Sequence, residues 1–233
     1  MSTIQKIRWN HIAIEGIAIV ASILLAFAID AWWDDRSERA RLVAAIQNIV
    51  AEVSEAREEI NSAVQRNQFR IDGMRQFLSL SPDELATLPR DTVVAISRSF
   101  VIPSPFDPGE IALQGFLTGG NLEKIADREL ANALIAWAQF PNEIDDDHED
   151  VSVMMIAVFE RAAGHGVWSA ILNEEADPKI PGATDLQDTL VALRRDNYFV
   201  DLLANSITYF ESFALQLADG IEIADQVLEA SKQ

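Results

Sequence analysis

The sequence predicts an all-α protein in which an N-terminal transmembrane helix continues into a long amphipathic helix that packs in a helical bundle. Three observations support this fold class. An uncharged apolar run covers residues 16–29, a heptad pattern follows it, and no segment alternates apolar and polar residues between turns at strand spacing. The 233 residues are long enough for one sizeable domain or two small ones.

The first predicted element is a membrane anchor at residues 12–33, preceded by a short tail at residues 1–11. A helix needs about 20 predominantly apolar residues to cross a bilayer. The only charged residues in this segment are Glu15 and Asp30, and a tryptophan pair at 32–33 closes it where an aromatic belt would lie. The segment therefore has the length and composition of a single membrane span.

Two alternatives to an anchor are a buried core helix and a cleaved signal peptide, for which Ala26-Phe27-Ala28 has the required form. The acidic residue Glu15 and a helical pattern that continues past the cleavage motif favour an uncleaved signal anchor. Two basic residues precede the anchor and three follow it closely, so the positive-inside rule barely discriminates. The short tail favours a cytoplasmic N-terminus and a periplasmic C-terminal domain, in a bacterial inner membrane.

One face of the predicted anchor carries small and acidic residues within an arc of about 120° at 100° per residue. These residues are Glu15, Ala18, Ser22, Ala26 and Asp30. A ladder of small residues lets two membrane helices approach closely, and intramembrane carboxylates usually face a bundle interior. The face predicts a homo-oligomer or a helical membrane partner. Alternatively, the two acids simply mark the two membrane interfaces, about 22 Å apart.

The net charge lies entirely in the predicted extramembrane domain at residues 34–233. Residues 1–33 hold two acidic and two basic residues, so the formal charge of −19 belongs to the rest of the chain. Nucleic acids and anionic lipid surfaces both attract clustered Lys and Arg, so neither is an expected partner of this domain. The absence of cysteine excludes thiol catalysis, disulfides and thiolate zinc sites.

Residues 34–80 predict a long amphipathic, coiled-coil-like helix, because apolar residues recur at alternating steps of four and three. They are Leu42, Ile46, Ile49, Val53, Ala56 and Ile60. The strict frame would next place Asn67 and Arg70 in the apolar seam. We therefore expect the frame to slip, with Val64, Ile71, Met74 and Leu78 taking over. No loop signal separates this segment from the anchor, so one helix is expected to continue to about Leu80.

Residues 81–233 predict a helical bundle with well-marked helix starts. The capping signals are Ser81, Asp91, Asp107 and Asp127. The expected helices after the first cover residues 92–100, 111–120, 128–140 and 143–163, then 185–196 and 198–230. Prolines and glycines separate them at 101–107, near Pro141, at 164–166 and at 177–182.

The densest polar cluster, residues 145–150, contains five acids and His148. A di-iron bundle would need a second acid-x-x-His pair, and an EF-hand would need a glycine at its sixth position, and neither is present. We interpret the acids as solvated residues near a helix start. His165 lies between two glycines without a recognisable nucleophile motif. We expect no catalytic residues, no metal site and no cofactor, and hence no enzyme.

Two sequence elements resemble an uncharacterised family of bacterial single-pass membrane proteins with a helical body. The first element has the layout E-x-x-x-(apolar)-A-x-x-I-D-x-W, present here as Glu15, Ala26, Ile29, Asp30 and Trp32. The second is a glycine-Asn-Leu-x-x-Ile-x-(Asp/Asn)-x-x-Leu element, present here at residues 120–130. The resemblance implies membrane residence and helical structure, and it implies no activity.

These observations predict a single-pass membrane-anchored helical interaction or assembly protein that contacts the lipid bilayer through residues 12–33. The alternative is a membrane-tethered ligand-sensing domain that acts through a partner protein, with a pocket near residues 100–106 or Trp168.

Overall fold

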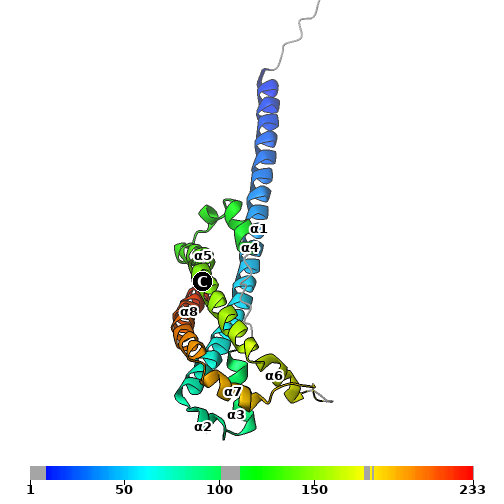
Figure 1. Ribbon diagram of the computed structural model, residues 1–233. Coiled ribbons are helices and arrows are strands. Elements are labelled where there is room, and N and C mark those ends of the chain that lie inside the picture. Colours follow the sequence, from blue (N-terminus) through cyan, green and yellow to red (C-terminus); the bar gives the residue numbers. More distant parts are fainter. Residues whose placement is uncertain (1–8, 101–110, 176–178, 180, 233) are drawn as a thin grey trace, which may run out of the picture. The chain divides into compact units, whose positions relative to one another are not determined.

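The structure is a computed structural model that describes residues 9–100, 111–175, 179 and 181–232 (Figure 1). Within these ranges, side chains are described from residue 18 onward, except those of Asp146, Asp147 and Glu175. The chain divides into two units, Met1–Asn48 and Ile49–Gln233. All the described elements are helices and no strand occurs among the described residues, which confirms the all-α prediction.

The first helix, α1 (Trp9–Ser79), is a single helix of 71 residues that belongs to both units. It confirms the prediction that one helix continues to about Leu80. No proline occurs before Pro82, so nothing interrupts the backbone hydrogen-bond ladder over this length. The helix stops where Pro82 restricts Ser81 to an extended conformation, with φ −75° and ψ 161°.

The described helices do not support the predicted transmembrane span at residues 12–33. Among the residues searched, no helical stretch is long and apolar enough to cross a membrane. The first six residues of the predicted anchor, 12–17, lie outside the described side chains.

The predicted slip of the heptad frame is wrong, because the frame continues without interruption to Phe77. The buried seam of α1 in the second unit comprises Ile49, Val53, Ala56, Ile60, Ala63, Asn67, Arg70, Met74 and Phe77. Asn67 and Arg70 are only 2% and 3% exposed. Val64 and Leu78 are half-buried, whereas Ile71 and Met74 are buried as expected. A heptad seam keeps the same face of the helix toward its packing partners, and here two polar side chains are buried within that seam.

The helices α5 (Arg128–Gly164) and α8 (Asn197–Ala230) lie side by side in the second unit, next to the later part of α1 (Figure 1). The predicted end of a helix near Pro141 is wrong, since α5 continues through this proline. An internal proline costs about 3 kcal/mol or more. Buried residues on both sides of it, including Trp137, Phe140 and Ile144, hold α5 against the bundle and offset this cost.

Short helices occupy the connections. Ser81 and Glu84 form a capping box at α2 (Pro82–Leu85). The predicted cap at Asp91 is wrong, because α3 (Arg90–Ser99) begins directly after Pro89. The helix α4 (Ile111–Thr118) ends at glycines as predicted, and Gly120 has φ +66°. The predicted cap at Asp107 lies outside the described residues.

Three of the remaining helices begin at an aspartate cap, of which only Asp127 is predicted as a cap from the sequence. After the 3-10 turn η1 (Leu122–Lys124), Asp127 accepts two backbone N–H groups at the start of α5. Asp185 does the same for α7 (Leu186–Arg194), and Asp196 for α8. The helix α6 (Val167–Glu175) follows the glycines at 164–166, where Gly166 has φ +79°. It was not expected from the sequence.

Candidate functional site

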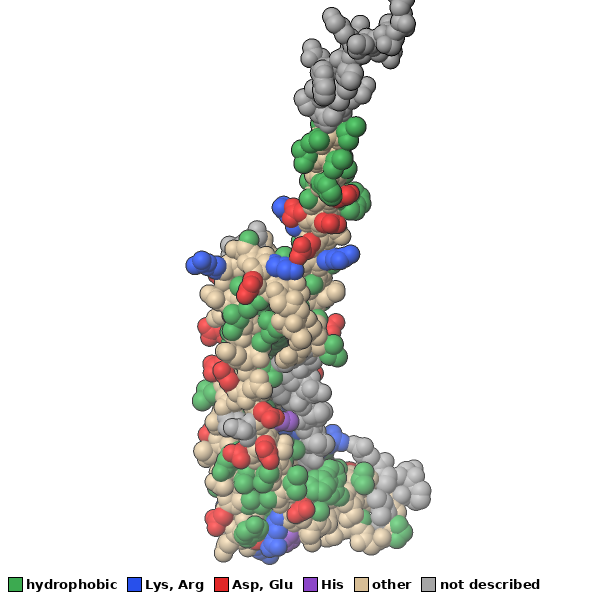
Figure 2. Space-filling model, turned by 90° about the horizontal axis from the view of Figure 1, so that it is seen from above, with side chains coloured by type: hydrophobic (Ala, Val, Ile, Leu, Met, Phe, Trp, Pro, Cys, Tyr) green, Lys and Arg blue, Asp and Glu red, His purple; other side chains and the backbone are tan. Residues whose placement is uncertain are grey.

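The first unit presents a helix whose apolar side chains are exposed on all sides from residue 18 to residue 33. Their exposed fractions range from 49% for Ile23 to 66% for Phe27. Figure 2 shows hydrophobic side chains gathered along this helix and followed by charged ones. Soluble proteins rarely expose contiguous apolar patches larger than a few hundred Å². This exposed segment is therefore one candidate functional surface.

The residues predicted to mediate membrane-helix association lie along this exposed segment. Ala18, Ser22, Ala26 and Asp30 are all exposed, and the Ser22 hydroxyl donates a hydrogen bond to the Ala18 carbonyl at 2.8 Å. The hydrogen bond to Ala18 satisfies the Ser22 hydroxyl within its own helix, so the Ser22 side chain can face an apolar environment without an unpaired donor. The side chain of Glu15 lies outside the described residues.

Aromatic and charged side chains follow the apolar segment. Trp32 and Trp33 have ring centroids 6.2 Å apart, and the Arg36 guanidinium lies 5.7 Å from the Trp32 ring centroid. Arg39 pairs with Asp35 one turn away at 2.7 Å, and both side chains are largely exposed. Exposed pairs of this kind contribute less than about 1 kcal/mol. Tryptophan next to arginine is the composition found where a helix leaves a bilayer.

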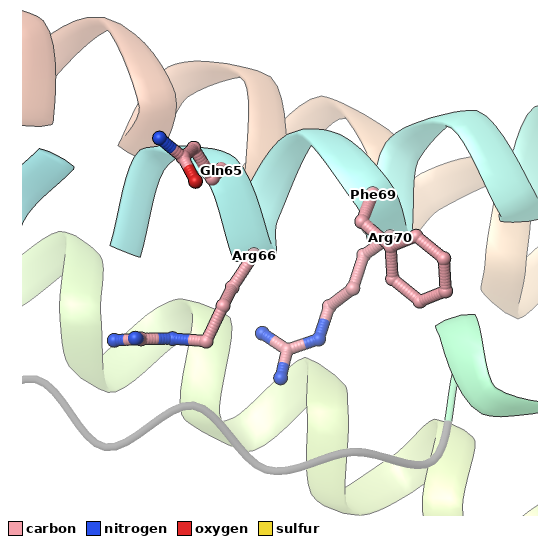
Figure 3. A pocket seen from close by; sticks show the side chains of 4 residues that line it. All are labelled: Gln65, Arg66, Phe69 and Arg70. Carbon is pink, nitrogen blue, oxygen red and sulfur yellow. The ribbon is translucent and has the colours of Figure 1, made fainter. Parts of the chain in front are cut away.

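A second candidate site lies on α1 in the second unit and was not expected from the sequence. Gln65, Arg66, Phe69 and Arg70 line a pocket of about 250 Å³ (Figure 3), which we call the Arg66–Arg70 pocket. The guanidinium groups of Arg66 and Arg70 point to the same side of α1. Sequence reasoning missed this site because it treated Arg70 as a break in the apolar frame, although the unbroken spacing placed it in the seam.

The two arginines have different surroundings. Arg66 donates to Glu59 at 2.7 Å and its side chain is 34% exposed. Arg70 is buried, with its guanidinium carbon 5.8 Å from the Phe210 ring centroid, a cation–π arrangement. Burial, and secondarily the nearby charge of Arg66, lower the pKa of Arg70 to about 10. The guanidinium is thus still charged at neutral pH, in a place where that charge is costly.

The acidic cluster at residues 145–150 shows no metal-binding arrangement among the described side chains. Asp145, Glu149 and Asp150 are exposed, and the ring of His148 stacks on Phe213 at 5.8 Å. No group of three metal-ligating residues occurs within the described part of the chain. The side chains of Asp146 and Asp147 lie outside it.

His165 belongs to a cluster that serves the start of α8. Its Nε2 lies 3.0 Å from a carboxylate oxygen of Asp196, and Arg161 donates to the same oxygen at 2.6 Å. Arg161, with a smaller contribution from His165, lowers the pKa of Asp196 to about 2 against the opposing effect of burial. Because Asp196 also caps α8, the cluster ties the end of α5 to the start of α8.

The sequence suggested a ligand pocket in two places. Among the described residues, both places are filled by packed aromatic side chains. Phe100 forms edge-on contacts with Phe77 and Phe199, at centroid distances of 5.7 and 5.6 Å. Residues 101–106 lie outside the described residues. Trp168 packs on Phe159 at 4.9 Å. Its buried indole nitrogen has no hydrogen-bond partner in the described structure.

Comparisons of the chain with models of known families, with curated proteins and with solved structures found no match. The resemblance to bacterial single-pass membrane proteins therefore remains a prediction from the sequence, and functional inference rests on the surfaces of the described structure.

Proposed function

We propose that the protein is a single-pass membrane-anchored helical interaction or assembly protein, which self-associates or pairs with a helical partner through residues 12–33. The observation that supports this proposal most directly is the exposure of apolar side chains on every side of the helix from residue 18 to residue 33. A helix that is apolar all round is stable only when lipid or protein covers it.

The energetics favour burial of this segment. Full burial of a large apolar side chain contributes roughly 1.5–3 kcal/mol. Covering the half-exposed Ile, Val, Leu, Phe and Trp side chains between Ile19 and Trp33 would contribute on the order of 10 kcal/mol. One charged residue, Asp30, opposes this with about 2.5–3.5 kcal/mol if it reaches the bilayer centre. The apolar contribution is larger, so transfer into lipid is favourable.

The proposed placement puts the N-terminus in the cytoplasm and the acidic helical domain in the periplasm. The formal charge of −19 supports a domain that stands away from anionic lipid headgroups. The small side chains of Ala18, Ser22 and Ala26 provide the face on which a second helix could approach closely.

Membrane insertion is tested with two matched double variants of the full chain. Leu24→Arg with Phe27→Arg places two charges within the apolar segment, and Ala40→Arg with Val43→Arg places two charges at the same spacing beyond it. We expect the first variant to leave the membrane fraction after alkaline extraction, because each central arginine costs several kcal/mol, and the second to remain there. Equal extraction of the two variants would contradict the proposal.

Association and orientation are tested by single cysteines, since the chain has none of its own. Cysteines replacing Ser22 or Ala26 are expected to cross-link two copies in membranes if the chain self-associates. Cysteines replacing Ala21 or Ala28 serve as controls, because these positions lie about 120–140° around the helix from the centre of the face that carries the small residues. A cysteine replacing Lys232 should react with a membrane-impermeant maleimide from the periplasmic side. Protection of that cysteine from the maleimide in intact spheroplasts would contradict the proposed orientation.

A further inference from the structure

The helices α5 and α6 together present an exposed apolar surface in the second unit, which we call the α5–α6 patch. On α5, Val153, Ile156 and Phe159 are 52%, 58% and 39% exposed. On α6, Leu172 is 59% exposed, and Trp168 packs on Phe159 with ring centroids 4.9 Å apart. Residues three or four apart share a helix face, so these five side chains form one continuous apolar surface.

The bundle core does not need the exposed residues of this patch. The inward face of α5 is already filled by Val151, Val158 and Ala162, which are at most 5% exposed. Ile156 lies about 160° around the helix from Val158, on the opposite side. Single exposed apolar residues are common on soluble proteins, whereas a contiguous group bordered by polar residues is characteristic of an interaction site.

Acidic residues border the patch on α5. Glu149 lies one helical turn before the first residue of the patch, and Glu160 lies one turn after Ile156. Both are exposed, and neither has an ion-pair partner among the described side chains. Arg161, the next residue along the chain, donates to Asp196 instead. The patch therefore combines an apolar centre with uncompensated negative charge at its edge.

The charge of this edge indicates which partner fits. A second copy of the chain would bring the same acidic edge to the contact, and like charges across an interface are unfavourable. A basic partner is attracted both by the edge and by the formal charge of −19. The patch residues on each helix are three or four positions apart, the spacing at which the apolar face of an amphipathic helix docks.

We propose that the α5–α6 patch binds an amphipathic helix of a partner protein. The apolar face of that helix covers Ile156 and Leu172, and its lysine or arginine side chains pair with Glu149 and Glu160. The patch belongs to the second unit, so this proposal does not depend on the membrane anchor. It adds to the anchor a second contact of different chemistry, in which charge as well as apolar area selects the partner.

The probe is a fluorescent peptide of about 18 residues, or five helical turns, with leucine on one face and lysine and alanine elsewhere. Its control carries glutamate in place of every lysine. Binding to the purified full chain in neutral detergent is measured by fluorescence anisotropy, with detergent alone as the blank. We expect the lysine peptide to bind, less tightly as the salt concentration rises, and the glutamate peptide to bind about tenfold more weakly or not at all. Equal binding of the two peptides, or no binding of the lysine peptide above the blank, would overturn the proposal.

Two pairs of matched variants locate the binding. Ile156→Ser should weaken binding of the lysine peptide about tenfold, because it removes an apolar contact from the centre of the patch. Leu215→Ser, which removes a 71% exposed leucine from α8, should leave binding unchanged. Glu160→Gln should weaken binding and reduce its salt dependence, whereas Glu222→Gln, at an exposed position on α8, should do neither. Equal losses in Ile156→Ser and Leu215→Ser would contradict the proposed location.

Cross-linking provides an independent readout, since the chain has no cysteine of its own. Ala163→Cys, at an exposed position beside the patch on α5, should form a disulfide with a lysine peptide that carries a terminal cysteine. Ala218→Cys, at an exposed position on α8, should not. If the patch instead joins two copies of the chain, Ile156→Ser would lower the mass of the complex in detergent and the peptide would not bind, which would overturn the proposal.

Discussion

The close approach of α5 and α8 at Gly220 provides a quantitative test of the bundle. A Cβ added to Gly220 would lie within 3.0 Å of three ring carbons of Phe140, which is closer than real Cβ atoms come. Phe140 is 3% exposed and stacks on the fully buried Trp137, with ring centroids 5.6 Å apart and an interplanar angle of 20°. The ring therefore has little room to move away. Gly220→Ala should force the two helices apart locally.

The expected magnitude follows from two opposing effects. Replacing glycine by alanine within a helix stabilises it by about 1 kcal/mol. Overpacking a well-filled core typically costs about 1–3 kcal/mol, and contact with three ring atoms places Gly220→Ala near the upper end. The net loss of unfolding free energy should be about 2 kcal/mol. Gly115→Ala is the matched control, since its Cβ would meet nothing within 4 Å, and it should stabilise the chain by up to about 1 kcal/mol.

The assay is a double-mutant cycle that combines Gly220→Ala with Phe140→Leu, in which the free energy of unfolding of each full-length variant is measured by urea unfolding in detergent. In the Phe140→Leu background the steric conflict is removed, so alanine at position 220 should become favourable by about 1 kcal/mol. The coupling free energy between the two positions is then about 3 kcal/mol, well above the usual error of additivity. A Gly220→Ala variant as stable as Gly115→Ala, or a coupling below about 0.5 kcal/mol, would refute the packing of Gly220 on Phe140.

Three further predictions concern polar groups within the second unit. Asn67→Leu should raise the free energy of unfolding by about 1 kcal/mol, seen as a higher urea midpoint. The buried Asn67 Oδ1 has no hydrogen-bond partner in the described structure and leucine suits the seam, and these gains should outweigh the loss of the bond that Asn67 Nδ2 donates to the Phe210 carbonyl at 2.6 Å; a lower midpoint would contradict this. Asp196→Asn should make the free energy of unfolding depend less on pH in the acid range. The lowered pKa of Asp196, about 2, stabilises the fold at pH values above the unfolded-state pKa of about 4, and this contribution is lost as the pH falls from 4 to 2. The urea midpoints of both proteins between pH 2 and pH 6 provide the check. Glu52→Gln should lower the free energy of unfolding by about 0.5–1 kcal/mol, because the Glu52 carboxylate accepts the N–H groups of residues 112 and 113 at the start of α4. Glu55→Gln, on the exposed face, is the control and should have no effect. Thermal unfolding of both variants provides the measurement.

The candidate sites differ in how far the sequence could predict them. The apolar segment before Asp34 is visible as composition, because its character depends on the residues themselves. The Arg66–Arg70 pocket is not, because an arginine is normally assigned to the solvent-facing side of a helix. One signal was available: the unbroken spacing of four and three from Val53 through Arg70 to Phe77. The polarity of Arg70 argues against its burial, but the structure shows that Arg70 is buried, as its position in the heptad spacing indicates.

The sequence by itself determined the all-α fold class, the continuous first helix and the starts of α5, α7 and α8. These features depend on contacts within one helical turn, such as the hydrogen bonds from backbone groups to Asp127 and Asp185 two or three residues earlier. Only the tertiary structure decided that α5 passes through Pro141, and that Asn67 and Arg70 are buried. Those outcomes depend on residues far apart in the chain, such as Phe210 beside Arg70 and Gly220 against Phe140, whose combined packing outweighs the local cost of a proline or a buried charge.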